Sequence, residues 1–372
     1  MTNRERWLRA LTFQTVDRVP LTPGGPREST RRRWESEGFP KGAELREVLS
    51  EKLGIDLPAW QLDIGRIDRM IPQFEEEILR HENGHYLVRD WMGAIVEISD
   101  EFDLTYLRTA RDFVTRRWVK CPVETREDFL AMKERYNPNV PSRYAMLNER
   151  LPALQGGEVS VFASINGPFW QLREWLGFEG LCYAMADDPD WVSEMCDFWQ
   201  EYTLALLQNA AQKVRIDHIM VNEDMAYKAH AMISPQMTRD FVLPCYRAWS
   251  AQFYAQGGSV FEVDSDGYIG TLLPLWLESG VNSNSPVEVA AHNDIVAYRA
   301  QYGKKMAFRG GIDKRKLAAG GSEMRAELLR VVPPLLREGG YIPSCDHGVP
   351  PDISWPNFLA YAELLAQLCG WK

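Results

Sequence analysis

The sequence predicts an α/β protein built as a TIM (β/α)8 barrel, and three observations support that prediction. Short β-prone runs alternate with helical segments over the C-terminal part of the chain. Residues that typically start helices stand between these runs. Ionisable or amide residues follow most of the runs, as at the working face of parallel α/β enzymes. A doubly wound sheet is the alternative, but the presence of eight candidate strands favours the barrel.

The first two candidate strands lie in the irregular N-terminal part of the chain. Arg18–Pro23 is a short apolar run bounded by prolines, and Ile55–Trp60 follows a helical pattern over Leu45–Gly54. Six further runs keep a regular rhythm beyond Gly157: Ser160–Ser164, His218–Asn222, Ser259–Val263, Gly280–Asn284, Lys305–Arg309 and Tyr341–Ser344.

Helix signals fill the intervals between the strands. The chain opens with an amphipathic pattern over Met1–Gln14, in which Thr2 and Glu5 have the spacing of a capping box. Longer helices are expected over Trp191–Val214 and over Pro235–Gln256, where Pro244 should introduce a kink. Three further helix starts are expected at Ser234-Pro235, at Ser285-Pro286 with Glu288, and at Asp313-Lys314.

Residues 66–140 break the strand–helix rhythm. His85–Ile98 reads as a β-hairpin that turns near Gly93, and Glu124–Tyr136 reads as a surface helix. We therefore expect one barrel domain over residues 1–372, with residues 66–140 as an insertion over one barrel end. Trp91 and Met92 are available to line a pocket there, although packing is favoured over a ligand role for both residues.

Composition narrows the class of protein. The chain has 372 residues, is 45% hydrophobic and carries a net charge of −10, so it can bury a large core and is a poor match for nucleic acid. Six Cys without a CxxC pair indicate a reducing compartment. Neither a secretory signal nor an apolar stretch of membrane-spanning length is visible. We expect a cytoplasmic enzyme of small molecules without a membrane partner, and a homodimer is a further hypothesis.

Two stretches near the C-terminus, Ser259–Gly267 and Tyr341–Asp352, carry the densest polar chemistry. Asp264 and Asp266 follow one strand two residues apart and should share a face, because strand side chains alternate. The second stretch ends its strand in a thiol, an acid and an imidazole: Cys345, Asp346 and His347. Taken singly, these residues could be helix caps, a packed thiol and a structural histidine. Together they predict a catalytic rim.

Other strand ends add candidates for substrate binding. These residues are Arg27, Asn166, Asn222, Lys228 and Arg309, with Tyr227 beside Lys228. Glu223 follows Asn222 and is a candidate acid or base. Surface salt bridges would explain Lys228 and Arg309 about as well.

Four segments of the chain resemble the uroporphyrinogen decarboxylase superfamily. They are RERWLRALTFQTVDRVPL near the start, NGPFWQLREWLGFEGL from Asn166, SPQMTRDFVLPCYRAW from Ser234 and DHGVPPDISWPNFLAYAELL from Asp346. The resemblance implies a TIM barrel. It also implies one of two activities: cofactor-free decarboxylation of tetrapyrroles, or zinc-dependent methyl transfer to or from a corrinoid protein.

The decarboxylase pattern is matched only in part. Its Arg-rich segment after the first strand is replaced by PGGPREST, which leaves Arg27 alone. Trp175 stands where the family has an active-site Tyr, and the family Ser at the fifth strand end is replaced near Val263-Asp264. His347 is kept. A substrate with many carboxylates needs more cations than this rim offers, so the resemblance is closer to the methyltransferase branch.

The methyltransferase branch binds zinc through a His-x-Cys-Gly step and a later Cys. Here the step reads Asp264-Ser265-Asp266-Gly267, and Cys345 holds the later position. The resemblance therefore predicts a zinc ion held by Asp264, Asp266, Cys345 and His347, with Glu223 or water as a further ligand.

The predicted function is zinc-dependent transfer of a methyl group between a small O-methyl substrate and a partner corrinoid protein, with catalytic roles for His347, Asp264 and Glu223. The alternative is a metal-free decarboxylase, in which Asp264 or Asp266 acts with His347 to protonate a carbon atom. A non-catalytic corrinoid or tetrapyrrole binder is the third reading.

Overall fold

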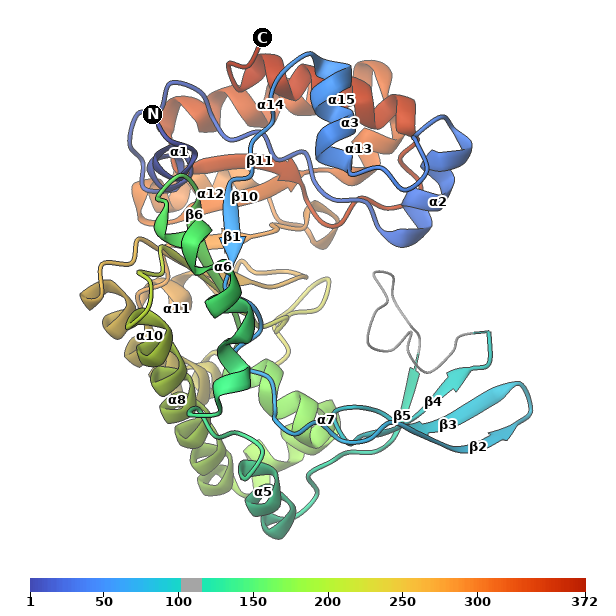
Figure 1. Ribbon diagram of the computed structural model, residues 1–372, viewed down its shortest axis with the longest axis vertical. Helices are drawn as coiled ribbons and strands as arrows, with labels where there is room; N and C mark the ends of the chain where they lie inside the picture. Colours follow the sequence, from blue (N-terminus) through green and yellow to red (C-terminus); the bar gives the residue numbers. More distant parts are fainter. Residues whose placement is uncertain (102–115) are drawn as a thin grey trace.

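A curled parallel sheet of seven strands forms the centre of the protein (Figure 1). A computed structural model describes residues 1–101 and 116–372. The strand order is β1-β6-β7-β8-β9-β10-β11, so after β1 the strands follow the chain. Their bounds are β1 Gln61–Asp63, β6 Ser160–Asn166, β7 His218–Asn222, β8 Val260–Asp264, β9 Ser283–Ser285, β10 Ala307–Ile312 and β11 Tyr341–Cys345.

The sheet confirms the predicted α/β class and the six regular strands, with shifts of a few residues at their ends. β6, β7 and β8 are largely buried, because both faces of a parallel sheet are covered. Since all the strands are parallel, their carboxyl ends lie at one edge of the sheet. That edge carries the polar residues discussed below.

The two early strand predictions are wrong. Arg18–Pro23 forms no strand, because Pro20 and Pro23 lack the N–H group that a ladder needs. The segment nevertheless lies against the last strand, since the Cys345 N–H donates to the Pro23 carbonyl over 3.3 Å. Ile55–Trp60 contains Pro58, and the strand begins after it as β1. The sheet therefore has seven strands rather than eight, a TIM-like half-barrel rather than a demonstrated closed barrel.

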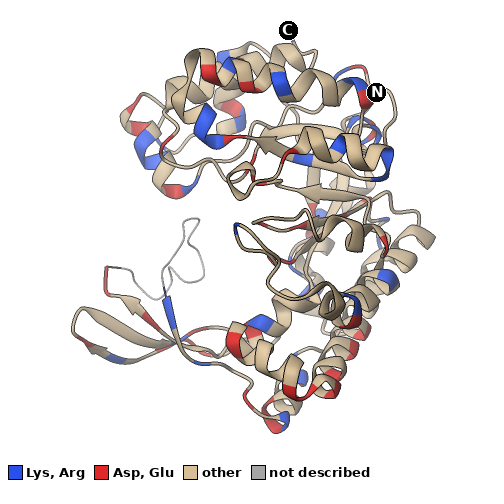
Figure 2. Ribbon diagram, turned by 180° about the vertical axis from the view of Figure 1, so that it is seen from behind, with Lys and Arg blue, Asp and Glu red and all other residues tan. Residues whose placement is uncertain are grey.

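Helices are arranged around the outside of the curled sheet (Figure 1). Their bounds are α1 Asn3–Leu11, α2 Glu28–Ser36, α3 Leu45–Leu53, α5 Arg126–Lys133, α6 Ala145–Gln155, α7 Pro168–Asp187, α8 Pro189–Ala211, α9 Pro235–Met237, α10 Leu243–Ala255, α11 Leu273–Leu277, α12 Ile295–Tyr302, α13 Lys314–Ala319, α14 Gly321–Glu338 and α15 Trp355–Leu368. None of the described helices is long and apolar enough to cross a membrane. Acidic and basic residues are interspersed along the chain (Figure 2).

Most of the predicted helix signals are confirmed. Thr2 and Glu5 form the capping box of α1, and the Ser234 and Asp313 side chains cap α9 and α13. A π-helical turn, Thr238–Val242, separates α9 from α10 just before Pro244. The start predicted at Ser285-Pro286 is wrong: Ser285 ends β9, and the next α-helix starts only at Ile295, capped by Asp294.

A second, antiparallel sheet interrupts the strand–helix rhythm. It consists of β2 Glu77–Glu82, β3 His85–Arg89, β4 Ile95–Ser99 and β5 Arg116–Lys120. The predicted hairpin over His85–Ile98 is confirmed as the β3–β4 pair, and the predicted surface helix is confirmed as the shorter α5. This sheet projects to one side of the molecule (Figure 1). The domain boundaries around it stay a prediction.

Candidate functional site

A row of polar residues crosses the carboxyl edge of the main sheet. Strand register pairs Asn166 with Asn222, Asn222 with Asp264, and Asp264 with Ser285. Because these residues stand at the same level of four adjacent strands, their side chains are brought to one place by pairing alone. The prediction that strand ends form one rim is confirmed for these positions.

A cavity of about 430 Å³ opens beside this row, and we name it the acidic chamber. It contains the four residues predicted to bind a metal. Its principal lining side chains are Met220, Asp224, Asp264, Asp266, Ser285, Arg309, Cys345 and His347. The two C-terminal stretches singled out from the sequence therefore meet in one volume.

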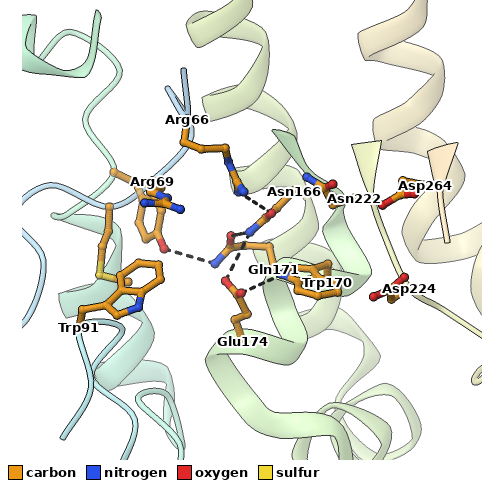
Figure 3. A pocket seen from close by; sticks show the side chains of 12 residues that line it. Arg66, Arg69, Trp91, Asn166, Trp170, Gln171, Glu174, Asn222, Asp224 and Asp264 are labelled. Atoms are coloured by element: carbon orange, nitrogen blue, oxygen red, sulfur yellow. Dashed lines mark hydrogen bonds between the residues drawn. The ribbon is translucent and has the colours of Figure 1, made fainter. Parts of the chain in front are cut away.

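A second cavity, of about 320 Å³, is named the aromatic chamber, and Figure 3 shows the side chains that line it. Asp224 and Asp264 line both chambers, and we name the two chambers together the cleft. The other lining residues of the aromatic chamber are Arg66, Arg69, Met70, Trp91, Tyr136, Asn166, Trp170, Gln171, Glu174 and Asn222. Trp91 thus lines a pocket, as the sequence allowed, whereas Met92 is buried in the core.

Asp264 lies where the chambers join and has the electrostatics of a proton donor. Burial raises the pKa of its carboxyl group to about 7, and the negative charges of Asp224 and Asp266 add to that rise. The hydroxyl oxygen of Ser285 lies 3.3 Å from Asp264 Oδ1. A carboxyl group with such a pKa is partly protonated at neutral pH, which suits acid catalysis.

His347 is held between an acid and a guanidinium. Its Nε2 atom lies 2.9 Å from Asp266 Oδ2, and its Nδ1 atom lies 3.1 Å from Arg27 Nη2. Arg27 can only donate, so this contact places the acceptor at Nδ1 and the proton at Nε2. The hydrogen bond to Asp266 raises the pKa of His347, and the charge of Arg27 opposes that rise.

Arg309, predicted as a substrate contact, lines the acidic chamber but is already paired. Its Nε atom donates to both oxygens of Glu262, over 2.8 Å and 3.1 Å, and Nη2 also contacts that carboxylate. Glu262 is fully buried, and despite that burial the charge of Arg309 holds its pKa at about 2. Ser283 and Ser285 donate to the same carboxylate. The guanidinium is therefore fixed and its charge is balanced inside the protein.

Glu223 lies outside the lining of both chambers. It is fully buried, accepts the Trp170 backbone N–H over 2.9 Å and contacts the hydroxyl group of Tyr246. Burial raises the pKa of its carboxyl group to about 7. Gly167 makes room for it, since a Cβ atom there would lie 1.8 Å from Glu223 Oε2. Glu223 therefore holds the start of α7 in place. This position does not support its predicted catalytic role.

Some of the remaining predicted substrate contacts lie at the cleft and others do not. Asn166 and Asn222 line the aromatic chamber, while Arg27 reaches the acidic chamber through His347. Lys228 and Tyr227 are exposed and line neither chamber. Lys228 therefore loses its support as a substrate contact of this cleft.

The predicted zinc ligands surround one chamber without forming a ligand set. Within residues 1–101 and 116–372, no three His, Cys, Asp or Glu side chains are grouped closely enough to hold a metal ion. Both ring nitrogens of His347 have hydrogen-bond partners, so neither nitrogen is available to a metal ion in this arrangement. Zinc needs an imidazole nitrogen with a vacant lone pair, so the arrangement does not fit it. Zinc stays a prediction, and no step below depends on it.

Sequence reasoning missed most of the aromatic chamber. Trp170, Gln171 and Glu174 come from one face of α7, and Arg66 comes from the irregular segment after β1. Asn166 connects them, because it accepts from Arg66 Nη2 over 2.7 Å and donates to Gln171 over 3.0 Å (Figure 3). The i, i+3 spacing of the polar residues Gln171 and Glu174 just after a strand end was the available signal.

The fold and the cleft together define a TIM-like α/β protein with its polar site at the carboxyl ends of the strands. The chain belongs to the uroporphyrinogen decarboxylase (URO-D) family, whose model matches residues 118–368. The predicted superfamily is thereby confirmed. A comparison with curated protein sequences found no match.

A solved structure with a similar fold is found at low sequence identity. A methyltransferase from Methanosarcina mazei is 15% identical with a TM-score of 0.61, and the alignment covers 99% of each chain. A proposed vitamin-B12-independent methionine synthase from Listeria monocytogenes is 10% identical over 96% of this chain and 98% of that one. Its TM-score of 0.37 is too low to support any conclusion.

Proposed function

We propose that the chain transfers a methyl group from a small O-methyl substrate to a corrinoid carried by a partner protein. The observation that carries the proposal is the charge of the cleft. Three carboxyl groups, those of Asp224, Asp264 and Asp266, face the acidic chamber, while the Arg309 guanidinium beside them is neutralised by Glu262. Such a chamber repels a carboxylate at the reacting position and favours a neutral ether oxygen.

The aromatic chamber supports the same substrate class. Trp91, Trp170 and Tyr136 supply apolar walls beside Asn166 and Asn222. Arg66 is bound to Asp68 through Nε and Nη2, over 3.0 Å and 3.1 Å, so its charge is balanced as well. Apolar walls with a few amide groups orient a small neutral molecule.

In the proposed reaction Asp264 acts as the general acid. The bond between the methyl carbon and the ether oxygen breaks, the methyl group passes to the corrinoid, and the electron pair stays on oxygen. Asp264 gives its proton to that oxygen, so the product leaves as a neutral alcohol or phenol. The corrinoid supplies only the nucleophile that accepts the methyl group. Asp266 and His347 hold each other beside this acid.

A decarboxylase is the second candidate, because an acid that is protonated near neutrality also suits protonation of a carbon atom. The carboxylate-lined chamber argues against it for a polycarboxylate substrate. The two reactions give different products. Incubation of the protein with cob(I)alamin and an O-methyl compound tests for methylcobalamin, and incubation with carboxyl-labelled acids tests for carbon dioxide. Methylcobalamin without carbon dioxide supports the proposal, and the reverse result replaces it with the second candidate.

A further inference from the structure

A third cavity lies outside the cleft and has no role in the proposed reaction. This outer pocket has a volume of about 620 Å³ and lies between α7 and β5. The residues that matter for its chemistry are Arg116, Trp118, Trp170, Arg173, Glu174 and Phe178.

Each of the two arginines among the described lining residues lies over an indole ring. The guanidinium carbon of Arg116 lies 4.7 Å from the ring centroid of Trp118, and that of Arg173 lies 4.6 Å from that of Trp170. A guanidinium over an aromatic face keeps N–H groups at its edge that can bind an anion. The outer pocket therefore presents two oriented cationic groups.

The charge of these arginines is only weakly balanced. No carboxylate of residues 1–101 or 116–372 forms an ion pair with Arg173, whose Nη1 atom donates to the backbone carbonyl of Asp224 over 3.0 Å. Arg116 has the buried carboxylate of Asp90 at 3.8 Å. Glu174, the half-buried acid of the pocket, accepts from Trp170 Nε1 over 2.7 Å. Glu179 also lines the pocket but is exposed to solvent, which leaves Arg116 and Arg173 facing Glu174 among the described residues.

The walls of the outer pocket are apolar and flat. Trp118 is 37% exposed, which is unusual for so large an apolar side chain, and Phe178 and Leu176 complete the surface. Aromatic walls with cations at the edge match a flat apolar molecule that bears a negative charge.

The outer pocket adjoins the cleft. Trp170 and Glu174 line both the outer pocket and the aromatic chamber. Arg173 also connects the outer pocket with the cleft, because it donates to the backbone carbonyl of Asp224, which lines both chambers and has a φ of 35°. An anion bound to Arg173 would therefore be separated from the acidic chamber only by Asp224.

We propose that the outer pocket is a second binding site, which takes a flat apolar molecule carrying a carboxylate, sulfonate or phosphate group. Arg116 and Arg173 bind the anionic group, and Trp118 and Phe178 pack against the apolar body. Binding at this site does not depend on the reaction in the cleft. A test of the outer pocket is therefore separate from a test of methyl transfer.

A matched pair of fluorescent probes tests the proposal on the full chain. 1-Anilinonaphthalene-8-sulfonate has a flat apolar body and a sulfonate, and N-phenyl-1-naphthylamine has the same body without the charge. We expect Arg116→Met and Arg173→Met each to weaken binding of the sulfonate probe by about tenfold, the effect of one lost charged hydrogen bond, and to leave the neutral probe within about twofold. Trp118→Ala should weaken both probes several-fold.

The controls separate this site from general surface effects. Arg239→Met removes an exposed arginine paired with Glu278, far from the pocket in sequence, and should change neither affinity. Arg116 and Trp118 lie at a sheet edge, so their variants keep the test valid if Arg173→Met disturbs the fold. Sulfonate affinity that is equal in wild type and both arginine variants, or equal loss of both probes, overturns the proposal.

Discussion

Glu262 binds Arg309 through both oxygens of a fully buried carboxylate, and the pair lies one alternation below Asp264 on β8. Ser285 connects the two levels, because its hydroxyl group contacts Glu262 Oε1 over 2.9 Å and Asp264 Oδ1 over 3.3 Å. Ser285 thus contacts both the ion pair and the proposed acid. Substitutions can remove the ion pair and the acid separately.

Breaking the buried ion pair should destabilise the protein. Glu262→Gln leaves the Arg309 charge without its partner, so we expect the free energy of unfolding to fall by about 3–5 kcal/mol. Urea titration measures it. Glu278→Gln, which breaks the exposed pair with Arg239, is the control and should cost less than about 1 kcal/mol. Equal effects of the two variants would show that Glu262 does not fix Arg309.

Removing the proposed acid should abolish turnover with little loss of stability. Asp264→Asn keeps the shape but carries no transferable proton, so we expect kcat to fall by about 100-fold or more. Lys228→Ala changes an exposed residue outside the cleft and should leave kcat unchanged. Steady-state kinetics with both variants checks this, and wild-type turnover by Asp264→Asn contradicts the assignment.

The wild-type rate should depend on pH through the same group. The pKa of Asp264 is raised to about 7, so the acid is protonated below that pH and loses its proton above it. We therefore expect kcat to fall as the pH rises through about 7. A pH–rate profile that rises through this range would mean that the ionised carboxylate is the active form.

Glu223 should make folding stability depend on pH. Its pKa is raised to about 7 in the folded state, from an ordinary value near 4.5, so the folded protein binds the proton more tightly. Stability is then highest below about pH 4.5 for this group and falls as the pH rises through about 7, by up to about 3 kcal/mol. Denaturation at pH 5 and 8 should show a smaller loss of stability in Glu223→Gln than in the wild type, because Asp264, whose pKa is raised in the same way, contributes equally in both proteins.

Chelation tests the zinc prediction directly. Because the four predicted ligands form no ligand set, we expect dialysis against a chelator to leave activity unchanged and Cys345→Ser to retain it. Elemental analysis of the same samples reports bound metal. Activity that is lost on chelation and restored by zinc would reinstate a metal centre in the acidic chamber.

The regular half of the fold is predictable from the sequence because most strands from β6 to β11 carry apolar residues and end near polar ones; β9, Ser283–Ser285, is the exception. The early strands are not, since Pro20, Pro23 and Pro58 interrupt the ladder where apolar composition alone suggests strands. Ser285-Pro286 has the composition of a helix start, yet pairing with its neighbours keeps Ser285 in β9. Pairing between strands is a tertiary effect that local composition does not contain.

The candidate site is also predictable from the sequence only in part. Asp264, Asp266, Cys345 and His347 are found from sequence, because each stands at a strand end. The contacts that set their chemistry are not, since Arg27, the partner of His347, and Ser285, the partner of Asp264, come from other segments of the chain. The aromatic chamber is missed because its helix face and the Arg66 segment meet only in the folded chain.

The most direct measurement follows the absorbance of cob(I)alamin mixed with the protein and candidate O-methyl compounds, in wild type and Asp264→Asn. The proposal requires methylcobalamin to form with at least one neutral methyl ether in the wild type and at least about 100-fold more slowly in the variant. Methylcobalamin formation at equal rates in both proteins, or carbon dioxide release from an acid with no methyl transfer to any ether, would contradict it.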